Sequence, residues 1–350
     1  MTRPTHQLIE GRYLQDILGQ PRVMTDTLNY LRTRQDLSTI KATFRSAPIE
    51  RIVLTGMGAS LSALYSLQLM LNAHGHTALT VETSELIHYM SGVLTSTSLI
   101  VVVSQSGRSA EIVRLLDQNA GKAGIIGITN TENSPLALQA DVTILTRAGE
   151  EFSVSSKTYV TALLALEVFG ASWCGDDLQQ AFADLSTAPV VAQRYLSYWR
   201  DHVAALADKL ADVRYLFLVG RGRSLSAVGT GALIAKESTR FHVEGMSSAA
   251  FRHGPMEMLG PDVMVLVFEG DLPTRDLNRK LITDVRDRSG RAELIGPGAT
   301  IPALQITSGP SHIAPVLEIL PVQMLTLALA ANVGLEPGRF EYATKITTEE

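Results

Sequence analysis

The chain has 350 residues, of which 45% are hydrophobic and 19% charged, a composition that predicts a folded globular protein rather than a disordered one. The net charge of −5 and the lack of any basic run argue against nucleic-acid binding. The single cysteine, Cys174, excludes an intrachain disulfide and a metal site built from several cysteines.

The first predicted element is a helical segment over residues 1–47, whose start lacks the apolar core of a signal peptide. From residue 51 the pattern changes to short β-rich runs that alternate with helical stretches. The runs are RIVLTG, ALTVET, SLIVVVS, AGIIGIT and DVTILT. This alternation predicts an α/β fold in which right-handed crossovers build a parallel sheet with helices on both faces.

The second half of the chain repeats the pattern of the first. GMGASLSAL, which begins at Gly56, returns as GRGRSLSAV at Gly220, an offset of 220 − 56 = 164 residues. The same offset aligns SLIVVVSQSG with DVMVLVFEGD. We therefore expect two tandem α/β domains, at residues 48–172 and 210–335. A helical connector at residues 173–209 would join them, and a C-terminal tail would follow at residues 336–350.

The most apolar stretch of the chain is residues 319–331, which contain Pro321 and Gln323. A membrane-spanning helix needs about 20 predominantly apolar residues. We therefore expect no membrane segment and a cytoplasmic location.

Glycine-rich turns follow the first predicted strand of each half, at residues 56–60 and 220–224. A dinucleotide-binding turn needs a third glycine where the helix meets the strand, and Leu61 and Leu225 stand there instead. Glu82 could imitate the acid that binds a ribose, but the incomplete turn argues against a nicotinamide or flavin, and we expect no cofactor and no metal. Structural tight turns are the alternative interpretation.

The turn Ser104-Gln105-Ser106-Gly107-Arg108-Ser109 lies between a predicted strand and a predicted helix. Unpaired backbone N–H groups at such a helix start favour an anion, and the serine hydroxyls and the glutamine amide add donors. No Walker lysine accompanies them, so a phosphate monoester is favoured over a nucleoside triphosphate. The alternative is a helix start capped by serine.

Four further segments carry candidate residues, each with an ordinary structural alternative. EEFSVSSKTYVT, at 150–161, offers hydroxyl donors or a second capped helix. Glu237 follows Lys236 in a predicted helix, where a lone glutamate is usually a solvated charge. His253 precedes Gly-Pro and is either a proton carrier or a loop residue. Lys345, in the segment FEYATKITTEE, is ordinarily a solvated charge.

Together these motifs resemble the SIS (sugar isomerase) phosphosugar-binding family, and in particular the isomerase portion of glucosamine-6-phosphate synthase. The resemblance implies that the first domain holds the phosphate of a sugar phosphate and that two residues, Val154 and Ser156, line the sugar. The implied phosphate-binding residues are Gly58, Ala59, Ser60, Ser104, Gln105, Ser106 and Ser109.

The resemblance also implies three catalytic roles. Glu237 would move a proton between C1 and C2 of the sugar, and Lys345 would form a Schiff base with the open-chain ketose. His253 would open the ring from the neighbouring subunit, which implies a homodimer with shared active sites. We expect Phe340, Tyr342 and Ile346 to anchor the tail that carries Lys345.

Some positions depart from the synthase pattern. Ile234 replaces an additional lysine that precedes the base, and Lys157-Thr158 reverses the usual Thr-Lys order. The chain begins Met1-Thr2 rather than with a catalytic cysteine, so no glutaminase domain is expected. The predicted activity is aldose–ketose isomerisation or deamination of an amino-sugar 6-phosphate, with the particular sugar left open. The alternative is a non-catalytic regulatory protein that senses sugar phosphates.

Overall fold

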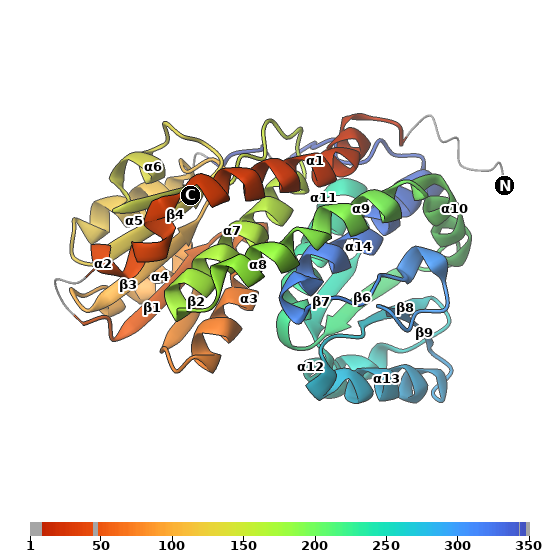
Figure 1. Cartoon of the computed structure of the whole chain (residues 1–350). Coiled ribbons are helices and arrows are strands. Elements are labelled where there is room, and N and C mark those ends of the chain that lie inside the picture. Colours follow the sequence, from red (N-terminus) through yellow and green to blue (C-terminus); the bar gives the residue numbers. More distant parts are fainter. Residues whose placement is uncertain (1–8, 45–47, 343, 348–350) are drawn as a thin grey trace. The chain divides into compact units, whose positions relative to one another are not determined.

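The computed structural model describes residues 9–44, 48–342 and 344–347 (Figure 1). The remaining parts of the predicted N-terminal segment and tail lie outside the described residues. The chain forms two compact units, which we name by their sheets. Among the described residues, the five-stranded unit comprises residues 22–44, 48–151, 155–187 and 344–347, and the four-stranded unit comprises residues 9–21, 152–154 and 188–342.

The five-stranded unit is built on a parallel sheet of order β2-β1-β3-β4-β5. Its central strand β3 is buried along its whole length, because helices cover both faces. All five predicted strands form: β1 (Arg51–Gly56), β2 (Ala78–Glu82), β3 (Ser98–Val103), β4 (Gly124–Thr129) and β5 (Val142–Leu145).

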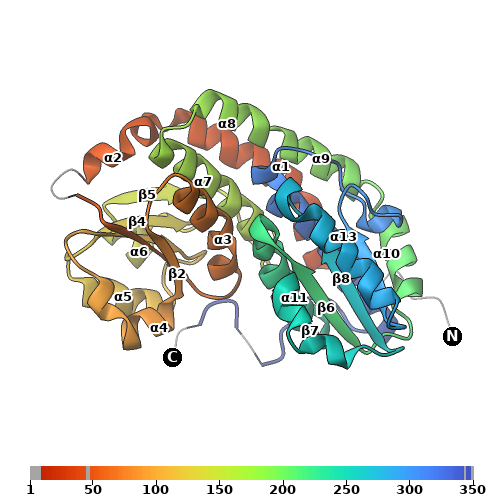
Figure 2. The ribbon, with the colours of Figure 1, turned by 90° about the horizontal axis from the view of Figure 1, so that it is seen from below.

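Helices cover both faces of this sheet, as the alternating pattern predicts (Figure 2). α3 (Gly58–Ala73) and α7 (Lys157–Cys174) pack together on one face. Val53, Ile100 and Val102 point to the other face, where they meet apolar residues of α4, α5 and α6. These three helices are Thr83–Tyr89, Ala110–Asn119 and Pro135–Gln139, and the unit also contains α2 (Ile40–Thr43) and α8 (Leu178–Leu185).

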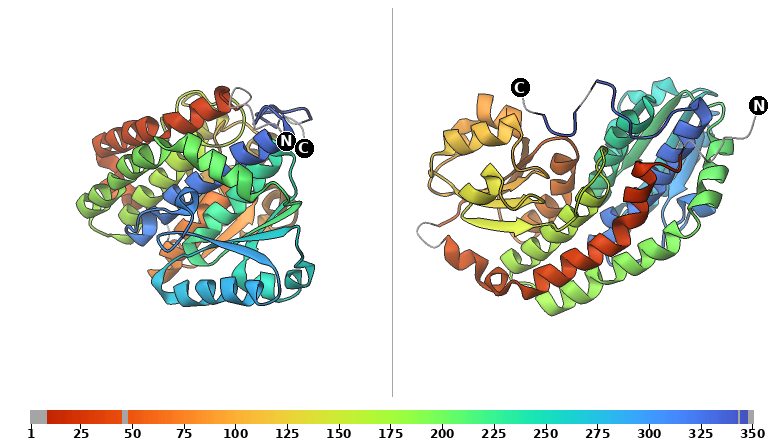
Figure 3. Two further views of the ribbon diagram at one scale, coloured as in Figure 1. Left: turned by 90° about the vertical axis from the view of Figure 1, so that its right-hand side faces the viewer. Right: turned by 90° about the horizontal axis from the view of Figure 1, so that it is seen from above.

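The four-stranded unit has a second parallel sheet, of order β7-β6-β8-β9 (Figures 1 and 3). Its strands are β6 (Tyr215–Gly220), β7 (Val243–Ser247), β8 (Val263–Phe268) and β9 (Arg291–Ile295). α11 (Leu225–Thr239) packs on α14 (Ala314–Val333), which also contacts α10 (Trp199–Lys209). Phe217, Val265 and Leu281 belong to the core on the face covered by α12 (Ser248–Arg252) and α13 (Leu272–Arg286). The two expected parallel sheets flanked by helices are therefore confirmed.

Corresponding strands of the two sheets share one order. Adding the offset of 164 residues to the bounds of β1 gives residues 215–220, the bounds of β6, and β7 and β8 lie one residue from the places predicted by β2 and β3. In each sheet the first strand lies between the second and third. The second strand is therefore added on one side of the first strand and the third strand on the other, which reverses the direction in which the sheet is built. Ligands of parallel sheets bind in the crevice that this reversal opens at the carboxyl ends of the strands.

Among the described residues, one helical stretch, 311–333, is long and apolar enough to cross a membrane by length and composition alone. It contains α14, and 94% of its most apolar window is buried inside the protein. A helix that is apolar on all sides and enclosed by other elements is typical of a protein core. α14 is therefore the central core helix of the four-stranded unit.

A reciprocal amide pair joins α14 to α1 (Arg12–Thr33) within the four-stranded unit. Gln20 Nε2 donates to Gln323 Oε1 at 2.7 Å, and Gln323 Nε2 donates back at 3.0 Å, with both side chains fully buried. Gln323→Leu should therefore lower the free energy of unfolding by about 1–3 kcal/mol, because it leaves the buried Gln20 amide short of partners. Urea unfolding measures this loss. The double variant Gln20→Leu/Gln323→Leu should recover most of it, and a double variant no more stable than the single one would contradict the explanation.

Candidate functional site at the carboxyl edge of the five-stranded sheet

The turn from Ser104 to Ser109 joins β3 to α5 at the reversal point of the five-stranded sheet. Ser104 Oγ accepts a hydrogen bond from Gly107 N at 3.1 Å, and Ser106 Oγ accepts one from Arg108 N at 3.3 Å. Each hydroxyl is only 7% exposed and keeps its own O–H available as a donor. Gly107 has a φ of 61°, and a Cβ there would lie 2.2 Å from Ser134 Oγ. The turn therefore requires glycine at this position.

The start of α5 differs from an ordinary serine-capped helix. Ser109 is the residue before the helix, yet its side chain makes no capping hydrogen bond within the part of the chain that the structure describes. Ala110 N donates instead to the carbonyl oxygen of Thr347, at 3.2 Å. The Ser109 hydroxyl is thus not used for capping, and the positive end of the helix dipole lies beside the two buried hydroxyls.

A pocket adjoins this turn within the five-stranded unit. α3 begins at Gly58, whose φ of 53° is left-handed, and brings Ala59 and Ser60 to the pocket wall. The polar side chains of the wall come from five separate segments: Ser60, Gln105, Thr129 with Asn130, Thr146, and Ser155 with Thr158 and Tyr159. Hydroxyl and amide groups supply hydrogen bonds without a net charge, as suits a polyhydroxylated ligand.

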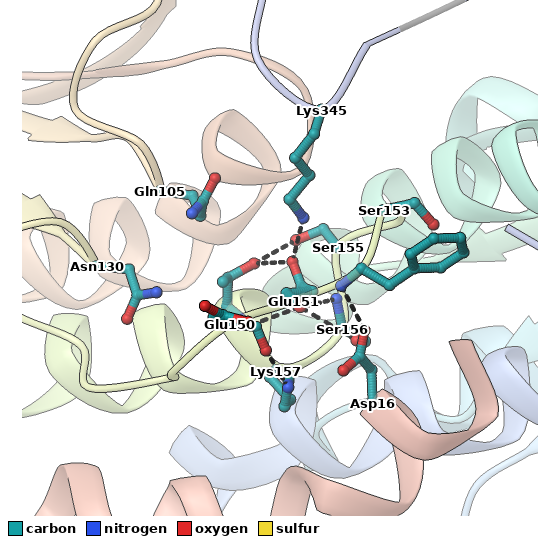
Figure 4. A network of polar contacts seen from close by, with 12 residues as sticks. Asp16, Gln105, Asn130, Glu150, Glu151, Ser153, Ser155, Ser156, Lys157 and Lys345 are labelled. Carbon is teal, nitrogen blue, oxygen red and sulfur yellow. Dashed lines mark hydrogen bonds and ion pairs between the residues drawn. The ribbon is translucent and has the colours of Figure 1, made fainter. Parts of the chain in front are cut away.

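Glu151 accepts hydrogen bonds from the loop that carries Ser156 and leads into α7 (Figure 4). Its Oε1 accepts hydrogen bonds from Ser156 N at 2.9 Å, Ser156 Oγ at 3.1 Å and Thr158 N at 3.0 Å. Its Oε2 accepts from Thr158 Oγ1 at 2.7 Å and lies 2.5 Å from Lys345 Nζ. The carboxylate is completely buried, so the loop supplies the donors that a buried charge requires.

Lys345 is held in the site rather than free in solvent. Its side chain is 26% exposed and reaches the buried Glu151 from the tail (Figure 4). The expected apolar anchoring is wrong for Tyr342, which is 92% exposed, whereas Phe340 and Ile346 are partly buried. Two polar contacts hold the described tail residues 344–347: the ion pair of Lys345 with Glu151 and the hydrogen bond from Ala110 N to the Thr347 carbonyl. Sequence periodicity reveals neither contact.

Three other predicted residues belong to the four-stranded unit. Val154 is buried. The two residues before it are held by hydrogen bonds, since Phe152 N donates to Asp16 Oδ2 at 2.7 Å and Ser153 Oγ donates to Gly338 O at 2.5 Å. Glu237 lies near the end of α11 and is partly exposed. His253 ends α12 and is exposed. The structure thus brings Ser60, the serine turn, Ser156 and Lys345 together in one unit and places Val154, Glu237 and His253 in the other.

Glu151 is the site residue that the sequence interpretation missed. The available signal was an acidic pair directly before a serine cluster that opens a helix, in EEFSVSSKT. The carbonyl of the preceding residue, Glu150, accepts a hydrogen bond from Lys157 Nζ (Figure 4). Across residues 9–44, 48–342 and 344–347, no group of three or more His, Cys, Asp or Glu side chains is placed to hold a metal ion.

The SIS domain family matches residues 46–172 and 209–332. The glutamine–fructose-6-phosphate aminotransferase (isomerizing) of Pyrococcus horikoshii is 28% identical over 351 residues, which cover 96% of this chain and 57% of the relative. The same enzyme of Methanothermobacter thermautotrophicus is 27% identical and is likewise covered over 57% of its length. This chain therefore spans a little more than half of these curated relatives.

Solved structures share the fold at lower identity. The C-terminal domain of glucosamine-fructose-6-phosphate aminotransferase from Francisella tularensis aligns with a TM-score of 0.84 at 22% identity, over 94% of this chain and 98% of that one. Tagatose-6-phosphate ketose/aldose isomerase from Escherichia coli gives 0.79 at 20% identity, over 97% and 98%. Glucosamine-6-phosphate deaminase from Thermotoga maritima gives 0.78 at 16% identity, over 97% and 100%.

Proposed function

The chain belongs to the SIS domain family, and on this premise we propose that it is an enzyme acting on a hexose 6-phosphate. The proposed reaction is aldose–ketose isomerisation, or deamination of an amino-sugar 6-phosphate coupled to isomerisation. The observation that carries the proposal is the serine turn, where the buried Ser104 and Ser106 and the start of α5 lie next in sequence to Gln105, which lines the pocket.

The phosphate would bind at this turn. The hydroxyls of Ser104, Ser106 and Ser109 and the amide of Gln105 offer donors, and backbone N–H groups at the start of α5 add the dipole of the helix. Ser60, at the start of α3, supplies a further hydroxyl to the pocket wall. Such a site holds a dianionic phosphate by hydrogen bonds and partial charges, without a lysine in the turn.

The chemistry would follow at the sugar end. His253 opens the ring, Glu237 carries a proton between C1 and C2, and Lys345 forms a Schiff base with the ketose carbonyl. Val154 and Ser156 line the sugar. We further propose a cytoplasmic homodimer in which His253 comes from the neighbouring subunit, and the exposure of this histidine at the end of α12 supports that role.

The second candidate function is a sugar-phosphate sensor without catalysis. The 2.5 Å contact between Lys345 Nζ and Glu151 favours it in one respect, because a lysine used only to hold the tail would make the same contact. A sensor would keep the phosphate site and need neither a base nor a nucleophile. Turnover of a bound ligand therefore distinguishes the two functions.

Ser106→Ala tests the phosphate site. It should weaken binding of glucose 6-phosphate, fructose 6-phosphate or their 2-amino forms by about 1–3 kcal/mol, because a charged acceptor loses a buried donor. Isothermal titration of these sugars, with ammonia and ketose release followed in parallel, measures affinity and identifies the substrate. Ser38→Ala, at an exposed serine of the same unit, is the matched control and should change nothing. Equal affinity of the parent protein for phosphorylated and unphosphorylated sugars at this site would contradict the assignment.

A further inference from the structure

The four-stranded unit has a cavity at the reversal point of its own sheet. The cavity has a volume of about 490 Å³ and is lined by residues that follow β8 and β9 and by the start of α14. β6 and β8 are the strands between which the chain reverses direction, so this position corresponds to that of the serine turn in the five-stranded sheet. The proposed catalytic residues do not line it.

Glu318 places a buried carboxyl group at the wall of this cavity. The side chain projects from α14 and is 3% exposed. Its Oε1 accepts a hydrogen bond from Ser224 Oγ at 2.8 Å, while Oε2 has no hydrogen-bond partner among the residues that the structure describes. A buried carboxyl oxygen without a partner lowers stability, so its presence at a cavity wall points to a ligand that completes its hydrogen bonding.

The protonation state of Glu318 makes it a donor. Burial raises its pKa to about 8, against the opposing effect of the Ser224 hydrogen bond and with a smaller contribution from the charge of Asp271. At neutral pH the carboxyl group is therefore mainly protonated. With Oε1 engaged by Ser224, Oε2 is the carboxyl oxygen left without a hydrogen bond among the described residues.

The other charged groups of the cavity wall offset one another. Asp271 and Arg275 both line it. Burial raises the pKa of Asp271, and the charges of Arg223 and Arg275 oppose this shift. Glu269 is 1% exposed but is already engaged, since Arg279 Nη2 lies 2.5 Å from its Oε1 and Gly298 N donates to its Oε2 at 2.7 Å. Arg275 Nε also lies 3.7 Å from Glu269 Oε1, so Arg275 is shared between Glu269 and the cavity wall. With Glu318 protonated, the charges that line the cavity sum to zero.

This wall does not suit a phosphate. The offset of 164 residues places Glu269 and Gly270 where the serine turn has Gln105 and Ser106, so an acid and a glycine replace an amide and a hydroxyl. Asp271 would repel an anion, and Arg275 would repel a cation. Hydroxyl groups of a ligand, in contrast, can accept from Glu318 and Arg275 and donate to Asp271.

We propose that this cavity is a second ligand site, which binds a neutral polyhydroxylated molecule such as an unphosphorylated sugar. Ser308 and Ser311 of the wall add hydroxyls, and Leu272 and Leu317 provide apolar surface for the carbon skeleton. The site is separate from the serine turn and does not depend on the reaction proposed for the chain.

The test is a binding titration of the full chain with glucose, N-acetylglucosamine and myo-inositol, with inorganic phosphate and ethylammonium as charged probes. At least one neutral probe should bind, and Arg275→Met should weaken it about tenfold or more, which corresponds to about 1.4 kcal/mol. Arg288→Met, beyond the end of the same helix, is the matched control and should bind normally. Ser106→Ala should also bind these probes normally, which separates this site from the phosphate site.

Glu318→Gln provides the second variant, because it keeps an acceptor for Ser224 and cannot titrate. Binding to the parent protein should decline as the pH rises through about 8, where Glu318 loses its proton, and binding to the variant should not. Asp271 and Arg275 are the charged groups that share the cavity wall with Glu318. Failure of every neutral probe to bind, preferential binding of phosphate or ethylammonium, or affinity unaffected by Arg275→Met would overturn the proposal.

Discussion

Replacing Glu237 by Gln should reduce turnover of the hexose 6-phosphate by about 10²–10⁴-fold while leaving its binding nearly unchanged. The amide preserves the shape of the side chain but cannot accept the proton that moves between C1 and C2. Proton NMR in deuterated water measures the effect directly, since exchange at these carbons should cease. Lys236→Gln, at the exposed neighbouring position of α11, is the matched control and should exchange normally.

The same variant tests the shared active site. Mixed dimers of Glu237→Gln and His253→Ala subunits should regain part of the activity, because one of the two sites then receives both intact residues. A fully active monomer would exclude a shared site. Unchanged turnover in Glu237→Gln would remove this residue from the mechanism, and binding without turnover in the parent protein would favour the sensor function.

Much of the fold could be predicted because its determinants are local. Val101, Val102 and Val103 indicate a strand buried on both faces, and the change to Ser-Gln-Ser-Gly marks the end of that strand. The conserved spacing between GMGAS and GRGRS also places β6 correctly. The strand and turn signals act within a few residues, and the repeat carries them over to the second half of the chain, so periodicity and turn chemistry are sufficient to read them.

The polar partners were harder to predict because they join distant segments. Glu151 and Lys345 are 194 positions apart in the sequence, and no pattern around either residue identifies the other. The exposure of Tyr342 has the same origin, since a polar contact rather than an apolar one positions the lysine-bearing tail. Glu318 likewise belongs to an apolar helix whose sequence does not show that this residue lines a cavity with one carboxyl oxygen unpaired among the described residues.

The second large effect is expected for Lys345→Arg, which should lower turnover by roughly 10³-fold or more. Arginine retains a positive charge for the buried Glu151, so the tail should stay in place and the protein should remain as stable as the parent. A guanidinium stays protonated at neutral pH and cannot form an imine. The variant thus separates holding the tail from nucleophilic chemistry, which deletion of the tail would not do.

Borohydride trapping identifies the covalent step. In the proposed mechanism the Lys345 amine attacks the ketose carbonyl carbon and water leaves to give an imine, which hydride from borohydride would reduce to a stable secondary amine. Glu151, 2.5 Å from Nζ, is positioned to take the proton that the ammonium must lose before this attack. Mass spectrometry with a ketose 6-phosphate should locate the adduct on Lys345 in the parent protein and in Lys157→Met, the matched control, and should find none in Lys345→Arg. Full turnover by Lys345→Arg, or an adduct on Lys157 or Lys236, would assign Lys345 to packing and leave proton transfer at Glu237 through an enediol as the route.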